Sequence, residues 1–350
     1  MTEQAHPAPR ALRTRRLWLR AWDPADAALL RPVLDASDTH LRPWVPFLEG
    51  EPRTLEATRE RLAGFRQAFE AGRQLVYGIF TPDGSRVLGE AMLFGDPPVR
   101  ELGFWTAVDA GRQGYALEAT QALLDLARGL LPTRQVHLRC APGNVACQAL
   151  ARRLGFAHRT TSSDGFVNAL GQEQDTMHWD LAVTSRTREE RAGDADAVRR
   201  VEEAAFEAPG EARLVDRLRG EPGVVSVVAE RAGEVVGHVL LSPVLVEGAG
   251  PRRALALGPM AVRPDHQRAG LGRALVRHAL VAAERAHADV VVVLGHPDYY
   301  PRFGFRPARG LGLLTTYDVP DDVFLALPLC SEATVPRGLV HYHPAFADLA

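Results

Sequence analysis

The feature that most limits the fold of this chain is an order of elements that occurs twice. Each half contains a β-hairpin, a further strand, a helix that begins at a glycine, another strand and a short helix that ends at Gly-Phe. Gly114 and Gly155 in the first half correspond to Gly270 and Gly304 in the second. A chain of 350 residues is also long for one hydrophobic core. We therefore predict two domains of one mixed α/β (α+β) plan.

The individual elements follow from hydrophobic periodicity and from turn and cap signals. The domain boundary is predicted at the polar stretch Val183–Arg188, which gives domains 1–184 and 185–350. In the first domain we predict strands at Arg15–Arg20, Leu75–Thr81, Val87–Phe94, Glu101–Val108, Gln135–Cys140 and Asp175–Val183, and helices at Asp23–Asp35, Thr54–Ala71, Gly114–Leu131 and Asn144–Leu154. In the second domain we predict strands at Val224–Glu230, Glu234–Leu241, Leu255–Val262 and Asp289–Leu294, and helices at Asp194–Phe206, Gly270–His287 and Pro297–Phe303.

The charge balance and the cysteines argue against several classes of function. The formal net charge is -2, and no basic stripe favours binding to nucleic acid. The chain has no lysine, so a mechanism through a lysine Schiff base is excluded. Cys140, Cys147 and Cys330 lack CxxC spacing, so we predict neither a disulfide framework nor a metal site.

Membrane and export signals are also missing from the sequence pattern. No stretch reaches the roughly 18 apolar residues that a membrane-spanning helix needs. The segment Met1–Arg10 lacks the apolar core of a signal peptide, and we expect a frayed tail there. We therefore expect a cytoplasmic protein with no membrane partner.

The strongest chemical motif is Gln267-Arg268-Ala269-Gly270-Leu271-Gly272, between a predicted strand and a long predicted helix. Glycines in such a loop let backbone N–H groups point into one small concavity, and the helix N-terminus adds partial positive charge. Arg268 can supplement this charge. The motif is typical of a site for a pyrophosphate. The alternative is a glycine-rich turn that binds no ligand.

With this loop the second half resembles the GNAT superfamily of N-acetyltransferases, in which Gln/Arg-x-x-Gly-x-Gly/Ala after the fourth strand holds the pyrophosphate of acetyl-CoA. Further matches are Val236–Val239, Leu257–Val262 and Gly295–Phe305, and together they resemble a branch of predicted acetyltransferases similar to YhbS. The resemblance covers residues 186–346. It implies a mostly antiparallel sheet, flanked by helices and splayed between strands four and five, with acetyl-CoA as cosubstrate.

The resemblance also implies roles for particular residues of the second domain. Tyr300 lies four residues before Gly304, where many family members have a tyrosine that protonates the departing thiolate. The alternative is an aromatic ring packed over the cleft. Strand four carries no carboxylate, so His238, His296 and Asp298 are the candidates for a general base, or else structural residues. The implied cofactor contacts are Met260, Ala261, Val262, Gln267, Arg268, Ala269, Gly270, Leu271 and Gly272.

Residues 14–182 resemble the branch of the same family that acetylates the N-termini of ribosomal proteins. The matches are the opening strand Thr14–Arg20, the loop Gly111–Ala116 and the segment Asn144–Phe156. The implied cofactor contacts are Val108, Arg112, Gln113, Gly114, Tyr115, Ala116 and Asn144. Three positions depart from the family pattern: Gly111 replaces the usual Gln, Arg or Trp, Cys147 replaces Ser, and Ala151 replaces the tyrosine.

The first domain therefore lacks the family's usual general acid. Glu101 and Glu90 are its candidates for a base, and both could equally face solvent. Cys147 could serve as a weak acid or as a small buried thiol. We expect this domain to bind coenzyme A, with turnover left open.

The expected reaction is direct transfer of an acetyl group to a primary amine within a ternary complex. The acceptor is either a small-molecule amine or a protein N-terminus, and the sequence does not distinguish them. The competing hypothesis is a binding module in which one or both domains hold acyl-CoA without chemistry. The expected assembly is a monomer or a homodimer.

Overall fold

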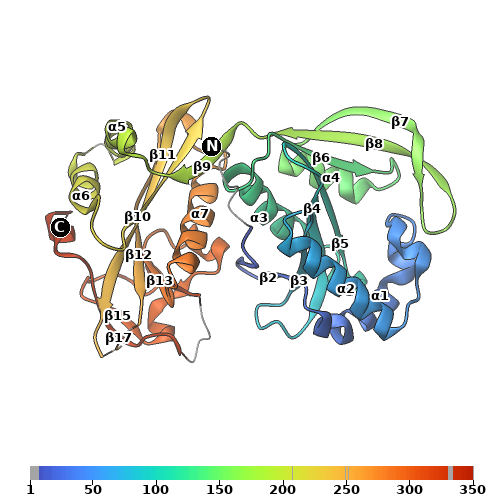
Figure 1. Ribbon diagram of the computed structural model, residues 1–350, viewed down its shortest axis with the longest axis horizontal. Helices are drawn as coiled ribbons and strands as arrows, with labels where there is room; N and C mark the ends of the chain where they lie inside the picture. The colour runs from blue at the N-terminus through green and yellow to red at the C-terminus, as the bar shows by residue number, and fades with distance from the viewer. Residues whose placement is uncertain (1–7, 207, 249, 251, 330–333, 350) are drawn as a thin grey trace. The chain divides into compact units, whose positions relative to one another are not determined.

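The computed structural model describes residues 8–206, 208–248, 250, 252–329 and 334–349. These described residues form two compact units: residues up to 127 and residues 132–183 make one, and residues 128–131 and those from 184 onward make the other. Each unit has its own β-sheet flanked by helices (Figure 1), which confirms the predicted mixed α/β class.

Among its described residues, the first unit has a sheet of eight strands in the order β1-β2-β3-β4-β5-β6-β8-β7. All neighbouring strands run antiparallel except β5 and β6, which are parallel. The strands are β1 (Ala11–Arg13), β2 (Trp18–Ala21), β3 (Leu75–Phe80), β4 (Val87–Phe94), β5 (Val99–Thr106), β6 (Gln135–Cys140), β7 (Ala157–Val167) and β8 (Glu173–Ala182). The bounds predicted for β4 and β6 are confirmed, whereas β1 and the long strand β7 were not predicted.

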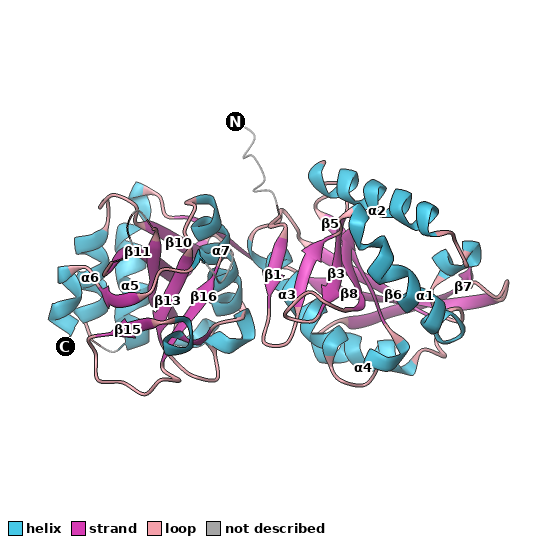
Figure 2. Ribbon diagram, turned by 90° about the horizontal axis from the view of Figure 1, so that it is seen from below, coloured by secondary structure: helices cyan, strands magenta, loops and turns pink. Residues whose placement is uncertain are grey.

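Four α-helices flank this sheet: α1 (Ala27–Leu41), α2 (Leu55–Glu70), α3 (Tyr115–Gly129) and α4 (Val145–Leu154). Figure 2 shows α1 and α2 on one side of the strands and α4 on the other. Leu30 and Leu34 of α1 and Leu62 of α2 are buried in one hydrophobic cluster with Val76 and Phe80 of β3. The helices are therefore held by their apolar faces, as expected for amphipathic helices on a sheet.

In the described part of the second unit the sheet has nine strands. Seven follow the order β14-β16-β13-β12-β11-β10-β9, and β17 joins β11 and β15. The pairing of β12 with β13 is parallel within an otherwise antiparallel path. The strands are β9 (Ser185–Glu189), β10 (Val225–Arg231), β11 (Glu234–Val246), β12 (Ala254–Val262), β13 (Val290–Leu294), β14 (Arg306–Pro307), β15 (Leu313–Thr315), β16 (Phe324–Pro328) and β17 (Gly338–His341).

The polar stretch at the predicted domain boundary is mostly a strand. β9 covers Ser185–Glu189 and pairs antiparallel with β10. Glu230 of β10 accepts hydrogen bonds from both Arg186 and Arg188 at 2.6 Å, so both arginines are paired across the two strands. Alternating charged side chains suit an edge strand when a carboxylate on the neighbouring strand lies opposite.

The helices of the second unit are α5 (Ala195–Phe206), α6 (Gly210–Leu218) and α7 (Leu271–Arg285), and α6 was not predicted. Figure 1 shows α5 and α6 on one side of the strands and α7 on the other. Leu271, Leu275 and Ala279 recur every four residues along α7 and are buried in the larger core cluster of this unit. The same cluster contains Leu255 and Leu257 of β12, so this face of α7 and β12 share one core.

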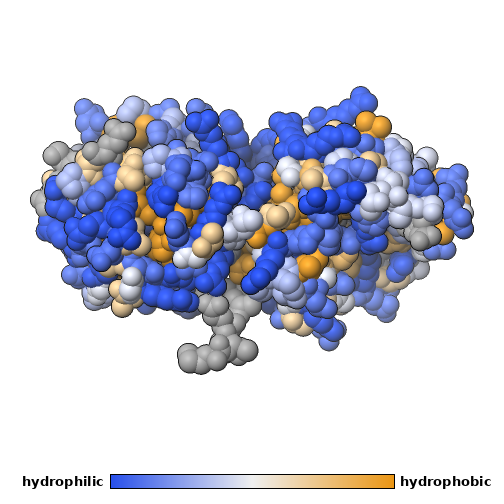
Figure 3. All heavy atoms as spheres, turned by 90° about the horizontal axis from the view of Figure 1, so that it is seen from above, coloured by the Kyte–Doolittle hydropathy of each residue, from blue (hydrophilic) through white to orange (hydrophobic). Residues whose placement is uncertain are grey.

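Figure 3 shows the hydropathy of one face of the surface. Hydrophilic residues predominate on the face drawn in Figure 3, with smaller hydrophobic areas between them. Within the described part of the chain, no helix combines the length and the apolar character needed to span a bilayer.

Candidate active site

Two neighbouring strands of the second unit diverge and leave a cavity. β12 and β13 pair through Ala254–Ala256 and Val290–Val292, and β12 then continues to Val262. A cavity of about 1190 Å³ lies along the diverging part, and residues of both strands line it. The register between β11 and β12 shifts at Gly258-Pro259, and both of these residues line the cavity. A bulge of this kind re-aims the backbone of a strand toward a site.

The loop between β12 and α7 forms one end of this cavity. Arg268 and Gly270 have left-handed backbone angles, with φ of 61° and 89°, and Gly270 is the N-cap residue of α7. The side-chain amide of Gln267 donates to the carbonyl of Val262 at 3.0 Å, which ties the loop to β12. Because the first turn of a helix has unpaired N–H groups, this geometry suits an anion.

Most of the predicted cofactor residues of the second domain border the cavity. The lining includes Met260, Val262, Gln267, Arg268, Gly270, Leu271 and Gly272. Ala261 and Ala269 are not among the lining residues. Ala261 is 3% exposed, and its side chain points to the other face of β12 because side chains alternate along a strand.

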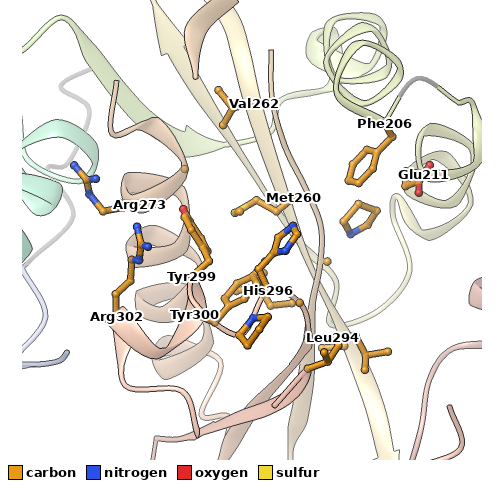
Figure 4. Close-up of a pocket in the computed structure, with 18 of the residues that line it drawn as sticks. Phe206, Glu211, Met260, Val262, Arg273, Leu294, His296, Tyr299, Tyr300 and Arg302 are labelled. Atoms are coloured by element: carbon orange, nitrogen blue, oxygen red, sulfur yellow. The ribbon is translucent and has the colours of Figure 1, made fainter. Parts of the chain in front are cut away.

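Tyr299 and Tyr300 both line the cavity, and their rings meet edge to face with centroids 5.2 Å apart. Burial, with a smaller effect of Tyr299, raises the pKa of Tyr300 above its usual value. A phenol in this state keeps its proton at neutral pH, as a general acid must. Figure 4 shows both rings in the cavity together with Met260 and His296.

His238 is not among the cavity-lining residues and is fully buried. Its Nδ1 lies 2.5 Å from a carboxylate oxygen of Glu202 on α5, and its Nε2 lies 2.9 Å from the hydroxyl of Ser226. Burial is the main cause that raises the pKa of Glu202. The predicted base is thus placed in a buried polar network between the sheet and α5, which is a structural position.

Of the other two candidates for a base in this domain, one borders the cavity and one does not. His296 lines the cavity, whereas Asp298 is not among its lining residues. Glu211, in the first turn of α6, is the one carboxylate among the described residues that line it. Sequence reasoning missed Glu211 because α6 was not predicted and no local motif surrounds it.

The first unit repeats the loop geometry. Arg112 and Gly114 have φ of 60° and 81°, close to the values of the corresponding pair in the second unit. β5 and β6 pair in parallel through Val99–Glu101 and Gln135–His137 before they diverge. The side chain of Asn144 accepts from the backbone N–H of Cys147 at 3.0 Å and caps α4. Tyr115 is the first residue of α3, with Ala116 next to it, and Gln113 accepts from Arg16 at 2.9 Å through its carbonyl.

The predicted catalytic carboxylates of the first unit both have partners. Glu101 accepts a hydrogen bond from Arg139 at 2.9 Å. It is the last residue of β5 that pairs with β6 before these two strands diverge. Glu90 is fully buried and accepts from the indole N–H of Trp105 at 2.6 Å. A hydrogen bond with Cys140, followed by burial, raises the pKa of Cys147, so its thiol keeps its proton at neutral pH.

Two family models, both described as an acetyltransferase (GNAT) domain, match the chain. One matches residues 16–157 and the other residues 222–307. Within the described residues no cluster of His, Cys, Asp and Glu is suited to hold a metal ion.

Three curated relatives illustrate the similarity. The uncharacterized N-acetyltransferase YjhQ of Escherichia coli is 34% identical over 41% of this chain and 80% of its own length. The uncharacterized N-acetyltransferase YhbS of the same organism is 33% identical over 44% of this chain and 93% of its own. The putative ribosomal N-acetyltransferase YdaF of Bacillus subtilis is 26% identical over 50% of this chain and 93% of its own.

A crystal structure of YhbS in complex with CoA is 32% identical and covers 48% of this chain and 94% of its own, with a TM-score of 0.45. The resemblance drawn from the sequence motifs is confirmed by the two family matches and by the curated relatives.

Proposed function

Since the chain belongs to the GNAT acetyltransferase family, we propose that its C-terminal domain transfers the acetyl group of acetyl-CoA to a primary amine. The observation that carries the proposal is the cavity between the diverging strands, which ends at the left-handed Arg268–Gly270 loop and contains Tyr300. An anion site, a long cleft and a protonated phenol are the features that thioester aminolysis with a phosphorylated cofactor needs.

In this proposal the loop Gln267–Gly272 and the first turn of α7 bind the pyrophosphate. The pantetheine lies along Met260–Val262 of β12, and the thioester carbonyl accepts a hydrogen bond from a backbone N–H of that strand. The neutral amine attacks the carbonyl carbon, so a C–N bond forms and the C–S bond breaks. Tyr300 gives its proton to the departing thiolate, the acceptor nitrogen loses a proton to solvent, and Tyr300 regains a proton from solvent. Most of the acceleration then comes from positioning.

For the N-terminal domain we propose binding of acetyl-CoA at the loop Arg112–Ala116, with contacts from Val108 and from the N-terminal end of α4 near Asn144. One observation favours a role without chemistry there. Ala151, which is fully buried, stands four residues before Gly155, at the position that Tyr300 has before Gly304 in the other domain. An amine at a protein N-terminus is the acceptor class to test first if this domain does turn over, because the curated relative YdaF is named a putative ribosomal N-acetyltransferase.

A calorimetric titration of acetyl-CoA into the intact chain tests both assignments. Gly270→Glu and Gly114→Glu each put a carboxylate into one loop, and each variant retains the other loop as its internal control for folding. We expect two equivalents per chain for the wild type and one for each variant. A single equivalent that only Gly270→Glu removes would restrict the cofactor to the C-terminal domain, and no binding by the wild type would overturn the proposal.

A further inference from the structure

Positive and negative side chains line opposite sides of the C-terminal cavity. Arg268, Arg273 and Arg302 border it near the loop and the start of α7, while Glu211 is the one carboxylate among the described lining residues. Figure 4 shows Glu211 beside Phe206 on one side, and Arg273 and Arg302 on the opposite side. An anion such as the cofactor's phosphates is attracted to the arginine side. The Glu211 side instead attracts a cation.

Aromatic rings lie on the side of this carboxylate, because Phe346 packs against a cluster that contains Leu214 and Val215 of α6, the helix that carries Glu211. Tyr317, Tyr342 and Phe346 line it and form a chain of tilted and edge-to-face contacts, with centroids 5.5 Å apart for the first pair and 5.4 Å for the second. Phe206, at the end of α5, also lines the cavity and is 39% exposed. Faces of aromatic rings attract ammonium groups, most strongly where water is excluded. We call Phe206, Glu211, Tyr317, Tyr342 and Phe346 the aromatic–Glu211 subsite.

The hydroxyl of Tyr342 supplies an independent observation. It is shielded from solvent and has no hydrogen-bond partner among the described residues. Burial, with a smaller contribution from Tyr317, raises the pKa of Tyr342, so the hydroxyl stays neutral and can accept a hydrogen bond. A buried hydroxyl without a partner costs free energy, and an N–H group of a bound ligand would satisfy it.

The reacting amine itself is a poor partner for this subsite. An amine attacks a thioester only when it is neutral, whereas a nearby carboxylate stabilises the protonated form. A subsite that combines Glu211 with aromatic rings therefore suits a second cationic group of the acceptor, one that stays charged while the other amine reacts. On the premise that the proposed acetyl transfer is right, we infer that the acceptor is dicationic: a diamine, or an amine that carries a further ammonium or guanidinium group bound at the aromatic–Glu211 subsite.

The test compares alkyl diamines with monoamines of the same carbon number, such as 1,4-diaminobutane with butylamine and 1,6-diaminohexane with hexylamine. Each is titrated calorimetrically into the intact chain, with and without saturating coenzyme A. We expect at least one diamine to bind roughly 10- to 100-fold more tightly than its monoamine, the range for hydrogen bonds to charged groups. Glu211→Gln should remove most of this preference and leave the affinity for coenzyme A unchanged. Tyr342→Phe should reduce it by a smaller factor.

Glu203→Gln is the matched control, because it removes one negative charge from an exposed position on α5 outside the cavity lining. It should keep the full preference for the diamine. If the wild type binds diamines and monoamines equally, or if Glu203→Gln has the same effect as Glu211→Gln, the inference is wrong.

Steady-state kinetics separate this role from that of a general base. A cation-binding Glu211 predicts that Glu211→Gln raises KM for the diamine, with kcat and its pH profile retained. A fall in kcat for diamine and monoamine alike, with loss of the acidic limb of the pH profile, would make Glu211 the base and overturn the inference. Failure of coenzyme A to bind, while the diamine preference persists, would overturn the proposed function and leave the subsite standing.

Discussion

The two domains share the backbone of a binding loop and differ in the side chains around it. Arg112 and Gly114 have nearly the same φ angles as Arg268 and Gly270, and in both units three residue pairs join the parallel strands before they diverge. Behind this common geometry, the C-terminal domain has Tyr300 where the N-terminal domain has a buried alanine. The comparison teaches that the backbone is suited to one type of ligand in both domains, while chemistry depends on a few side chains that differ.

The two units also differ in the buried polar groups that β4 and β11 carry. Glu90 of β4 bonds to Trp105 and lies 3.4 Å from Arg61 of α2, whereas His238 of β11 pairs with Glu202 of α5. Both groups tie the sheet to the helix that covers it. The pair in the C-terminal domain has both side chains fully buried, while 13% of the side chain of Arg61 is exposed.

Breaking these networks should give the largest effects. His238→Ala leaves Glu202 buried without its partner and should lower the free energy of unfolding of the C-terminal domain by about 3–5 kcal/mol. Glu90→Gln retains an acceptor for Trp105 and should cost the N-terminal domain about 1–3 kcal/mol. Denaturant unfolding, followed by a probe in each domain, measures both values. An equal loss of unfolding free energy in the two domains would contradict the predicted difference between the two buried groups.

Replacing the proposed acid gives the next effect. Tyr300→Phe should lower kcat of the C-terminal domain by about 100-fold, because the thiolate must leave without a proton donor. The affinity for acetyl-CoA should change little, since the ring remains in place. Tyr299→Phe is the control and should retain most of the turnover. Full activity of Tyr300→Phe across the pH range would remove the main chemical difference between the domains.

A helix cap in the N-terminal domain gives a smaller effect. Asn144→Ala removes the bond to the N–H of Cys147 and should destabilise that domain by about 1 kcal/mol. Asn144→Asp should retain most of the stability because a carboxylate also caps a helix. Thermal unfolding of both variants checks this. Weaker acetyl-CoA binding by Asn144→Ala with unchanged unfolding would assign the residue to the ligand rather than to the cap.

The smallest expected effect is on the stability of the N-terminal domain at acid pH. Hydrogen bonds from Thr81 and Ser85 lower the pKa of Asp83 from 3.8 to about 2. The folded state therefore favours the charged carboxylate, and this stabilisation is present above pH 3.8 and is lost as the pH falls toward 2. Asp83→Asn should flatten that part of the stability profile. NMR titration of the carboxyl carbon would show a midpoint near 3.8 if the hydrogen bonds do not form in solution.

The sequence predicted those parts of the fold that local patterns specify. The bounds of β4 and β6 are as predicted, and α7 differs from its predicted range only at its ends. The loop at Gly270 was recognisable because glycine and a helix start leave a local signature. By contrast, β16 and β17 were not predicted, because their short apolar runs gain stability only from pairing with β13 and β11.

The candidate site was predictable to the same extent. Tyr300 and the loop come from continuous motifs, whereas Phe206, Glu211 and Tyr342 come from segments far apart in the chain. Only the folded sheet brings these three together in one cavity. His238 was a plausible base in the sequence, but strand alternation turns it toward α5.

The left-handed arginine of each loop has a consequence for engineering. A residue with a side chain in this region of backbone space carries a conformational cost of about 1–2 kcal/mol, which glycine avoids. Arg112 and Arg268 both accept this cost at a position next to the predicted phosphate site. If both arginines contact the phosphates as proposed, thermostability and ligand affinity oppose each other in these loops. Selection for heat resistance alone would then favour glycine at both positions, at the expense of the proposed phosphate contact.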